Sequence, residues 1–133
     1  MLRDLHKNVV TDIAVAIIQA EDDATIWDAY LLNLKNVTIK NILVTSRGYG
    51  KHEGEKKNTS SLRFFFDELP AQSFIKIEGL QEALLGLTSE YWVSFYESGK
   101  AYDKKYIFLP DSINNEEFLS EIPLIEKKGS IIK

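Results

Sequence analysis

Residues 47–60 form the stretch whose side chains are best suited to bind an anion. Three glycines and dense charge interrupt any apolar pattern here, which predicts a mobile loop. Basic residues interleaved with an aromatic ring could grip phosphate groups or stack on a base. The residues concerned are Arg47, Tyr49, Lys51, Lys56 and Lys57. The whole chain carries a net charge of −4, so a solvated loop is favoured, and nucleic-acid binding is the alternative.

Four aromatic residues form a second candidate group. Each lies on an expected strand, on the opposite side from the residues expected to point into the core. They are Trp27, Phe65, Trp92 and Tyr96. An outer aromatic patch would bind a protein partner or a second copy of the chain. The equally weighted alternative is that the parity is reversed or that both strand faces are buried, because register cannot be determined from one sequence.

Patterns for catalysis or metal binding are weak. The acidic run at residues 21–23 could offer oxygen ligands, but neighbouring side chains diverge, so a polar turn at Asp23 is favoured. His6 and His52 have no second ligand or carboxylate at a useful local spacing, although a triad assembled from distant residues stays open. The chain has no cysteine, which excludes disulfides and thiolate chemistry. We therefore expect no catalytic residue, no metal site and no cofactor.

Alternating apolar residues predict a β-rich domain. The expected strands cover residues 11–19, 26–34, 37–46, 61–67, 72–78, 90–96 and 102–109. The second of these has two apolar faces, which predicts a strand covered on both sides. We expect a bulge near Lys40 and Asn41 and a hairpin turn at residues 97–100. Residues 79–88 fit a short helix and an irregular edge strand almost equally well.

The strand spacing predicts a single domain over residues 1–133. Residues 1–10 are expected to form a lead-in, and residues 111–133 a C-terminal extension that includes a short helix capped by Asp111 or Ser112. Long helices that could make parallel crossovers are missing from the pattern. About seven strands with one or two short helices therefore favour an all-β, two-sheet antiparallel sandwich of immunoglobulin-like type.

The apolar residues nowhere form a run of about 18, so we expect no membrane span. A chain without cysteine is typical of a reducing compartment, and a cytoplasmic setting is the simplest prediction.

Two resemblances add to these expectations. The segments YLLN (30–33) and LPAQSF (69–74) resemble small immunoglobulin-like domains, which implies a role in binding or assembly without catalytic residues. Four further segments are WDAYLLNL (27–34), VTSRGYG (44–50), EYWVSF (90–95) and DKKYIFLP (103–110). Together these resemble a group of short bacterial proteins that are sometimes labelled as a phenylalanyl-tRNA synthetase subunit. This second resemblance implies no aminoacylation, because the chain lacks the arginine-bearing strand motif and the glycine-rich strand–helix segment of such a synthetase.

The sequence thus predicts a non-catalytic binding or protein-interaction module that meets a protein partner, or itself, through its aromatic residues. The alternative is an accessory domain that associates with RNA or a tRNA synthetase through the basic loop at residues 47–57.

Overall fold

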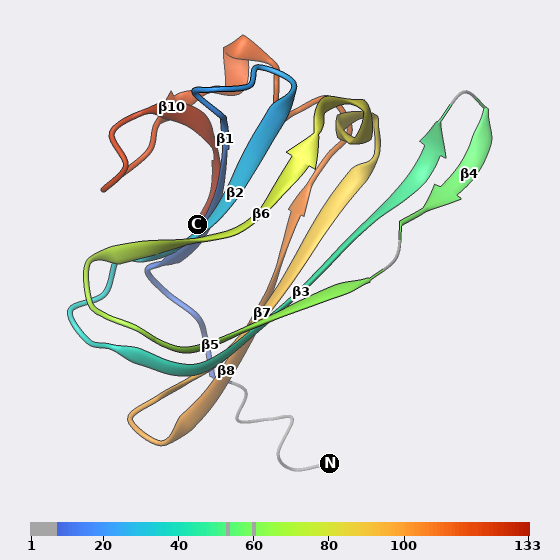
Figure 1. Ribbon diagram of the computed structural model, residues 1–133. Helices are drawn as coiled ribbons and strands as arrows, with labels where there is room; N and C mark the ends of the chain where they lie inside the picture. Colours follow the sequence, from blue (N-terminus) through green and yellow to red (C-terminus); the bar gives the residue numbers. More distant parts are fainter. Residues whose placement is uncertain (1–7, 53, 60) are drawn as a thin grey trace.

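A computed structural model describes residues 8–52, 54–59 and 61–133 of the chain (Figure 1). These residues form ten strands and two short 3₁₀ helices. The strands are β1 (Ile13–Gln19), β2 (Ile26–Asn33), β3 (Ile39–His52), β4 (Glu55–Asn58), β5 (Leu62–Leu69), β6 (Ser73–Gln81), β7 (Thr88–Glu97), β8 (Lys100–Phe108), β9 (Ser120–Glu121) and β10 (Lys128–Ile132). The helices are η2 (Glu82–Gly86) and η3 (Glu116–Phe118). Across the described ranges, no helix is long and apolar enough to cross a membrane.

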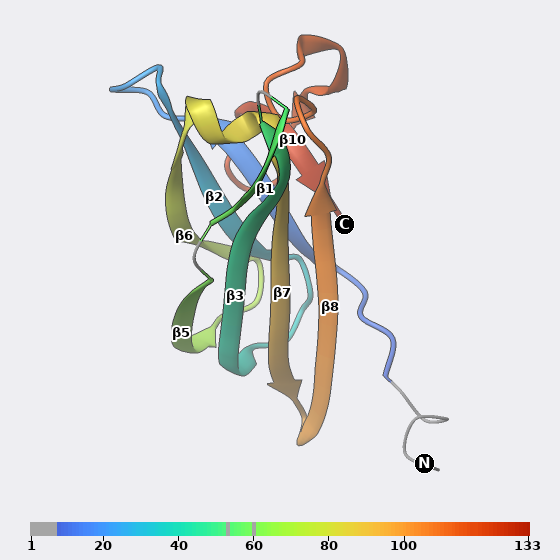
Figure 2. The same cartoon turned by 90° about the vertical axis from the view of Figure 1, so that its right-hand side faces the viewer.

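The strands pack as two antiparallel sheets. The first sheet has the order β6-β2-β1-β10-β9, and the second has the order β4-β3-β7-β8, with β5 also paired to β3. β4 and β5 follow one another along the same edge of β3, because β7 occupies the other edge. Figure 2 shows β3, β7 and β8 side by side in front of β1 and β2.

The chain path through these sheets matches the predicted fold class. A hairpin of β1 and β2 opens the first sheet, and the chain then crosses to β3 and β5 in the second. It returns to β6 beside β2 and crosses again to the β7–β8 hairpin beside β3. This is the pairing order of an immunoglobulin-like sandwich in which an extra strand lies beside the third one. The all-β, two-sheet antiparallel sandwich is therefore confirmed, with more strands than the sequence suggested.

β1 and β2 bury both of their faces, as the two apolar faces of the second strand predict. Side chains such as Val15 and Leu31 lie in the main core between the sheets. Their neighbours Ala16 and Leu32 point the opposite way, into a second and smaller apolar cluster. The first sheet is therefore covered on both sides along these two strands.

The C-terminal residues provide the cover for this second cluster. β10 pairs with β1 on one side and with β9 on the other, while Ile122 and Ile131 pack into the cluster. Gly129 permits the close approach, because a Cβ atom there would lie 2.7 Å from the carbonyl oxygen of Ile17. The expected extension at residues 111–133 is thus an integral part of the first sheet.

The expected loop at residues 47–60 was wrong over much of its length. β3 continues to His52 and pairs with β4, from Tyr49 opposite Asn58 to His52 opposite Glu55. The glycines and lysines here have low strand propensity. The ladder from β3 to β7, which runs as far as Tyr49 opposite Thr88, holds the segment extended despite that propensity.

Two helix predictions also need correction. Residues 79–88 contain both predicted alternatives in part, since β6 extends to Gln81 and η2 follows directly. The predicted C-terminal helix is only the short η3. Its N-cap is Asn115, whose side-chain oxygen accepts a hydrogen bond from the backbone N–H of Glu117, instead of Asp111 or Ser112.

The predicted bulge and hairpin are both present. The β3–β7 register shifts between Lys40 and Leu43, and Asn41 has a φ of 49°. The β7–β8 turn places Ser98 at a φ of 51° and Gly99 at 76°. A two-residue hairpin turn with positive φ at both positions matches the right-handed strand twist, which explains the Ser-Gly pair.

Candidate functional site

The outer face of the second sheet carries a patch of exposed apolar side chains, which we call the aromatic face. Its members are Leu43, Phe65, Trp92, Tyr96 and Ile107. The exposed fractions are 62% for Phe65, 43% for Trp92 and 47% for Tyr96, which are high for rings on sheet strands. Side chains of this size seldom gather in the open on one sheet face unless another molecule covers them.

The strand register brings these side chains together. Leu43 on β3 lies opposite Phe65 on β5 and opposite Ser94 on β7. One step along the same face, Thr45 lies between Arg63 on β5 and Trp92 on β7. Cross-strand neighbours on one face lie about 5 Å apart. Phe65 and Trp92 therefore lie on the same face of the sheet, on either side of Leu43 and Thr45.

Cations flank the centre of the aromatic face. The Lys105 ammonium lies 4.7 Å from the centre of the Trp92 ring, a cation–π contact. Arg63 lies on the other side of Thr45 from Trp92. Neither Lys105 nor Arg63 forms an ion pair with any residue that the structure describes. Two cations therefore flank this part of the face, and Asp103 on β8, opposite Ser94, adds one negative charge beside them.

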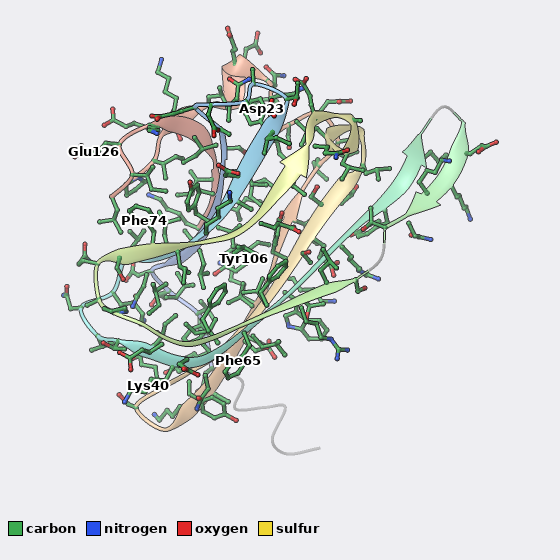
Figure 3. All side chains as sticks on the ribbon, viewed as in Figure 1. Asp23, Lys40, Phe65, Phe74, Tyr106 and Glu126 are labelled. Atoms are coloured by element: carbon green, nitrogen blue, oxygen red, sulfur yellow. The ribbon has the colours of Figure 1, made fainter. Side chains whose placement is uncertain are left out.

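Three of the four predicted aromatic residues lie on this face, and Trp27 does not. Trp27 is 6% exposed and belongs to the main core, so its assignment to the outer patch was wrong. Its strand is apolar on both sides, so the sequence does not show which side chains point into the main core. Within the described residues its indole N–H has no hydrogen-bond partner. Figure 3 shows Phe65 on the outer side of the second sheet and Tyr106 between the sheets.

The predicted basic residues line the β3–β4 hairpin. Lys51 lies directly opposite Lys56, and Lys57 makes an exposed ion pair with Glu55 at 3.7 Å. Like charges directly opposite each other in a ladder repel, so this pair favours a nearby anion. These lysines, together with Tyr49, line a shallow open depression on the hairpin. The side chain of His52 lies outside the described part of the chain.

Arg47 is already engaged within the protein. Its Nε donates a hydrogen bond to Oε2 of Glu90 at 3.0 Å, and its guanidinium lies 5.0 Å from the centre of the Tyr49 ring. The hydrogen bond to Glu90, and then the charge of Glu90, raise the pKa of Arg47. Because Glu90 is buried, this ion pair neutralises Arg47 locally. Of the predicted anion-binding residues, Lys51 and Lys56 are the ones left without an ion pair among the described residues.

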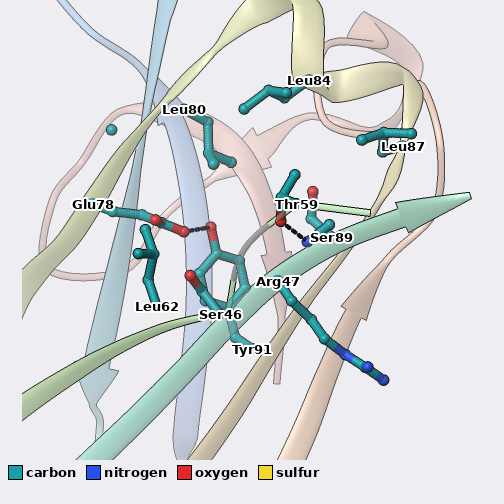
Figure 4. Close-up of a pocket in the computed structure, with 12 residues that line it drawn as sticks. Ser46, Arg47, Thr59, Leu62, Glu78, Leu80, Leu84, Leu87, Ser89 and Tyr91 are labelled. Atoms are coloured by element: carbon teal, nitrogen blue, oxygen red, sulfur yellow. Dashed lines mark hydrogen bonds between the residues drawn. The ribbon is translucent and has the colours of Figure 1, made fainter. Parts of the chain in front are cut away.

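A pocket of about 230 Å³, which we call the end pocket, opens between the sheets near the start of the β3–β4 hairpin. The inner side chains of β3 become smaller toward it, from Ile42 and Val44 in the core to Ser46 and Gly48 in the pocket wall. This loss of volume leaves space that the opposing sheet does not fill. Leucines from β5, β6, η2 and the position directly after η2 form the apolar wall: Leu62, Leu80, Leu84 and Leu87 (Figure 4).

Polar groups meet at one side of the end pocket. The hydroxyl of Tyr91 donates a hydrogen bond to Oε2 of Glu78 at 2.8 Å. Burial, and then the adjacent negative charge of Glu78, raise the pKa of Tyr91 well above its usual value. Ser46 is a buried residue in the same wall, whereas the buried Ser89 lies further along β7, beside Thr59 (Figure 4). The guanidinium of Arg47 points away from this group in Figure 4, consistent with its pairing with Glu90.

The acidic run at residues 21–23 forms a turn. The carboxylate of Asp23 accepts hydrogen bonds from the backbone N–H and the hydroxyl of Thr25, at 2.9 and 2.6 Å. These hydrogen bonds lower the pKa of Asp23. Glu21 pairs with Lys127. Within the described ranges, no three His, Asp or Glu side chains come together in a way that could hold a metal ion.

No protein-family model, curated protein or solved structure gives a significant match to the chain. The resemblance to proteins labelled as a phenylalanyl-tRNA synthetase subunit therefore stays a prediction.

The sequence interpretation missed the end pocket. A signal was present in the falling size of the inward residues along β3, from Ile42 to Gly48. The pocket could be recognised only with the sheet pairing known, since strands β5, β6 and β7 and helix η2 supply the other walls.

Proposed function

We propose that the chain is a non-catalytic protein-binding module that docks a partner on the aromatic face. The observation that carries this proposal is the gathering of Phe65, Trp92 and Tyr96 on one open sheet face. Rings of this kind supply most of the binding energy at protein interfaces, where they are enriched relative to other surfaces. The lack of cysteine supports a cytoplasmic setting for this encounter.

The charges on the face favour a different protein over a second copy of the chain. In a symmetric dimer the same patch meets itself, so the cations Arg63 and Lys105 of one copy would enter the same interface as those of the other copy. Like charges brought together at an interface cost binding energy. A partner with an apolar centre rimmed by Asp or Glu would instead pair with both cations.

Affinity capture with matched variants tests this proposal. The tagged wild-type chain is compared with the double variant Phe65→Ser/Trp92→Ser in extract of the native cell. Phe74→Ser serves as the control, because Phe74 is an exposed ring on the first sheet. We expect one protein to be retained by the wild type and by Phe74→Ser and lost from the double variant. Equal retention by all three chains would refute the proposal, and light scattering that shows a wild-type dimer would favour self-association.

A second candidate function is RNA binding through the β3–β4 hairpin. The observation that favours it is the like-charged pair of Lys51 and Lys56 beside Tyr49, neither of which forms an ion pair with a described residue. Titration with tRNA at low and moderate salt tests it, because binding to phosphate weakens steeply with salt. If the hairpin binds RNA, tRNA binding should weaken with salt and should be abolished in the double variant Lys51→Gln/Lys56→Gln. The absence of tRNA binding at micromolar protein would refute this function.

A further inference from the structure

We propose that the end pocket binds a small organic ammonium, a primary amine carried on a short apolar chain or ring. This site is separate from the aromatic face: Glu78, Ser46 and Tyr91 lie on the inner side of the sheets, and Trp92 lies on the outer side.

The size and walls of the pocket define the apolar part of the ligand. A liquid water molecule occupies about 30 Å³, so about 230 Å³ holds a ligand of roughly seven or eight heavy atoms. The four leucines, Leu62, Leu80, Leu84 and Leu87, offer an apolar surface to most of such a molecule. Ligand sites typically combine apolar walls of this kind with a few converging polar groups.

The charge of the pocket defines the head group. Glu78 brings a carboxylate into the wall, and one of its oxygens already accepts the Tyr91 hydroxyl. No cation among the described residues pairs with Glu78. The two nearest candidates along the strands are committed elsewhere, with Lys76 Nζ 3.1 Å from Oδ1 of Asp28 and Arg47 on Glu90. The pocket therefore repels an anion and attracts a cation.

A second acceptor beside the carboxylate can hold another N–H of an ammonium. The hydroxyl of Ser46 lies in the pocket wall and forms no hydrogen bond with another described residue. A hydroxyl can accept a hydrogen bond, so Ser46 and the Glu78 carboxylate can each accept one N–H of a primary ammonium. A neutral alcohol of the same shape would satisfy fewer of these groups and would forgo the charge-assisted bond.

Three probes of equal length separate charge from shape: hexylamine, hexanol and hexanoate. Each is titrated into the ¹⁵N-labelled full chain at neutral pH, and the amide shifts of Gly48, Gly79 and Ser89 in the pocket wall are followed. We expect saturable shifts with hexylamine, at least about tenfold weaker binding of hexanol, and no binding of hexanoate. Equal affinities for all three probes, or shifts that map outside the pocket, would overturn the proposal. So would the absence of any shift up to the solubility limit of the amine.

Glu78→Gln is the decisive variant, because its amide oxygen can still accept the Tyr91 hydroxyl. We expect hexylamine affinity to fall to that of hexanol, while the spectrum remains that of a folded chain. Glu82→Gln is the matched control, since Glu82 is an exposed carboxylate at the start of η2. Ser46→Ala removes one acceptor without adding volume to the pocket and should weaken the amine more than the alcohol. An unchanged amine preference in Glu78→Gln would contradict the proposal.

Discussion

The hydroxyl of Tyr106 on β8 donates a hydrogen bond to the carbonyl oxygen of Ile13 on β1 at 2.6 Å, and so ties the two sheets together. Both residues are fully buried. This bond fixes β8 against β1 and helps to set the spacing of the sandwich whose outer face carries Trp92.

Removing this hydroxyl should destabilise the fold. Tyr106→Phe leaves the ring in place but deletes the donor, so we expect the free energy of unfolding to fall by about 1–2 kcal/mol. Urea unfolding followed by circular dichroism measures the change. Tyr96→Phe is the control, because Tyr96 is exposed and its loss of a hydroxyl should change stability by less than about 0.5 kcal/mol.

The same residue makes stability depend on alkaline pH. Burial raises the pKa of Tyr106, so the folded chain keeps its phenol neutral at a pH where the unfolded chain ionises it. The unfolded state then binds fewer protons, so this contribution to stability is complete below about pH 10, the unfolded pKa of tyrosine, and is lost as the pH rises above it. Tyr91, whose pKa is also raised by burial, acts in the same direction. Between pH 8 and 11 the free energy of unfolding should fall less steeply with pH in Tyr106→Phe than in the wild type. Equal slopes in the two chains would contradict this explanation.

Asn33 joins the two sheets where the chain crosses between them. Its buried side-chain nitrogen lies within hydrogen-bond distance of the carbonyl oxygens of Val37, Leu69 and Pro70, at 2.9, 3.0 and 3.1 Å. Asn33→Asp would place a carboxylate against these oxygens, so we expect a loss of about 2–4 kcal/mol in the free energy of unfolding. Urea unfolding tests this, with Asn114→Asp at an exposed position as control. If Asn33→Asp leaves the free energy of unfolding nearly unchanged, the segment that crosses between the sheets must rearrange in the variant.

Gly129 should control the attachment of the C-terminal strand. A Cβ atom at this position would lie 2.7 Å from both the carbonyl oxygen of Ile17 and a side-chain carbon of Ile18. Gly129→Ala should therefore cost about 1–3 kcal/mol and speed hydrogen exchange of the Ile131 amide selectively. In Gly99→Ala the new methyl meets no atom within 4 Å, and the positive φ alone should cost about 1 kcal/mol without affecting β10. Exchange at Ile131 that is unchanged by Gly129→Ala would show that β10 is not held by this contact.

The two tryptophans report the two environments separately. Trp92→Phe leaves the core residue Trp27, whose emission should be blue-shifted and weakly quenched by acrylamide. Trp27→Phe leaves Trp92, whose emission should be red-shifted and strongly quenched. A shielded Trp92 in the isolated chain would show that its face is covered by a second copy.

The sequence predicts most of the first sheet and the β7–β8 hairpin, because alternation and the Ser98-Gly99 turn are local signals. It places Phe65, Trp92 and Tyr96 outward correctly, since their neighbours on the same strands are clearly apolar on one side. The outward placement of Trp27 was wrong because its strand is apolar on both faces. β10 escapes prediction because it is short and its stability comes from pairing with a distant strand.

The candidate sites depend more heavily on tertiary contacts. Lys51 and Lys56 can be recognised as basic residues, but their position directly opposite each other follows only from the β3–β4 register. The neutralisation of Arg47 requires Glu90, which lies on another strand and far away in the sequence. The end pocket likewise needs Glu78 from the first sheet beside Tyr91 from the second.

Site-specific photo-crosslinking is the most direct test of the aromatic face as a docking surface. A benzophenone amino acid replaces Phe65 on this face or, as control, Phe74 on the first sheet, and the native cell is then irradiated. We expect one discrete crosslink to a different protein from position 65 that Trp92→Ser removes, and none of the same mass from position 74. Identical crosslinks from both positions, or none from position 65, would contradict it.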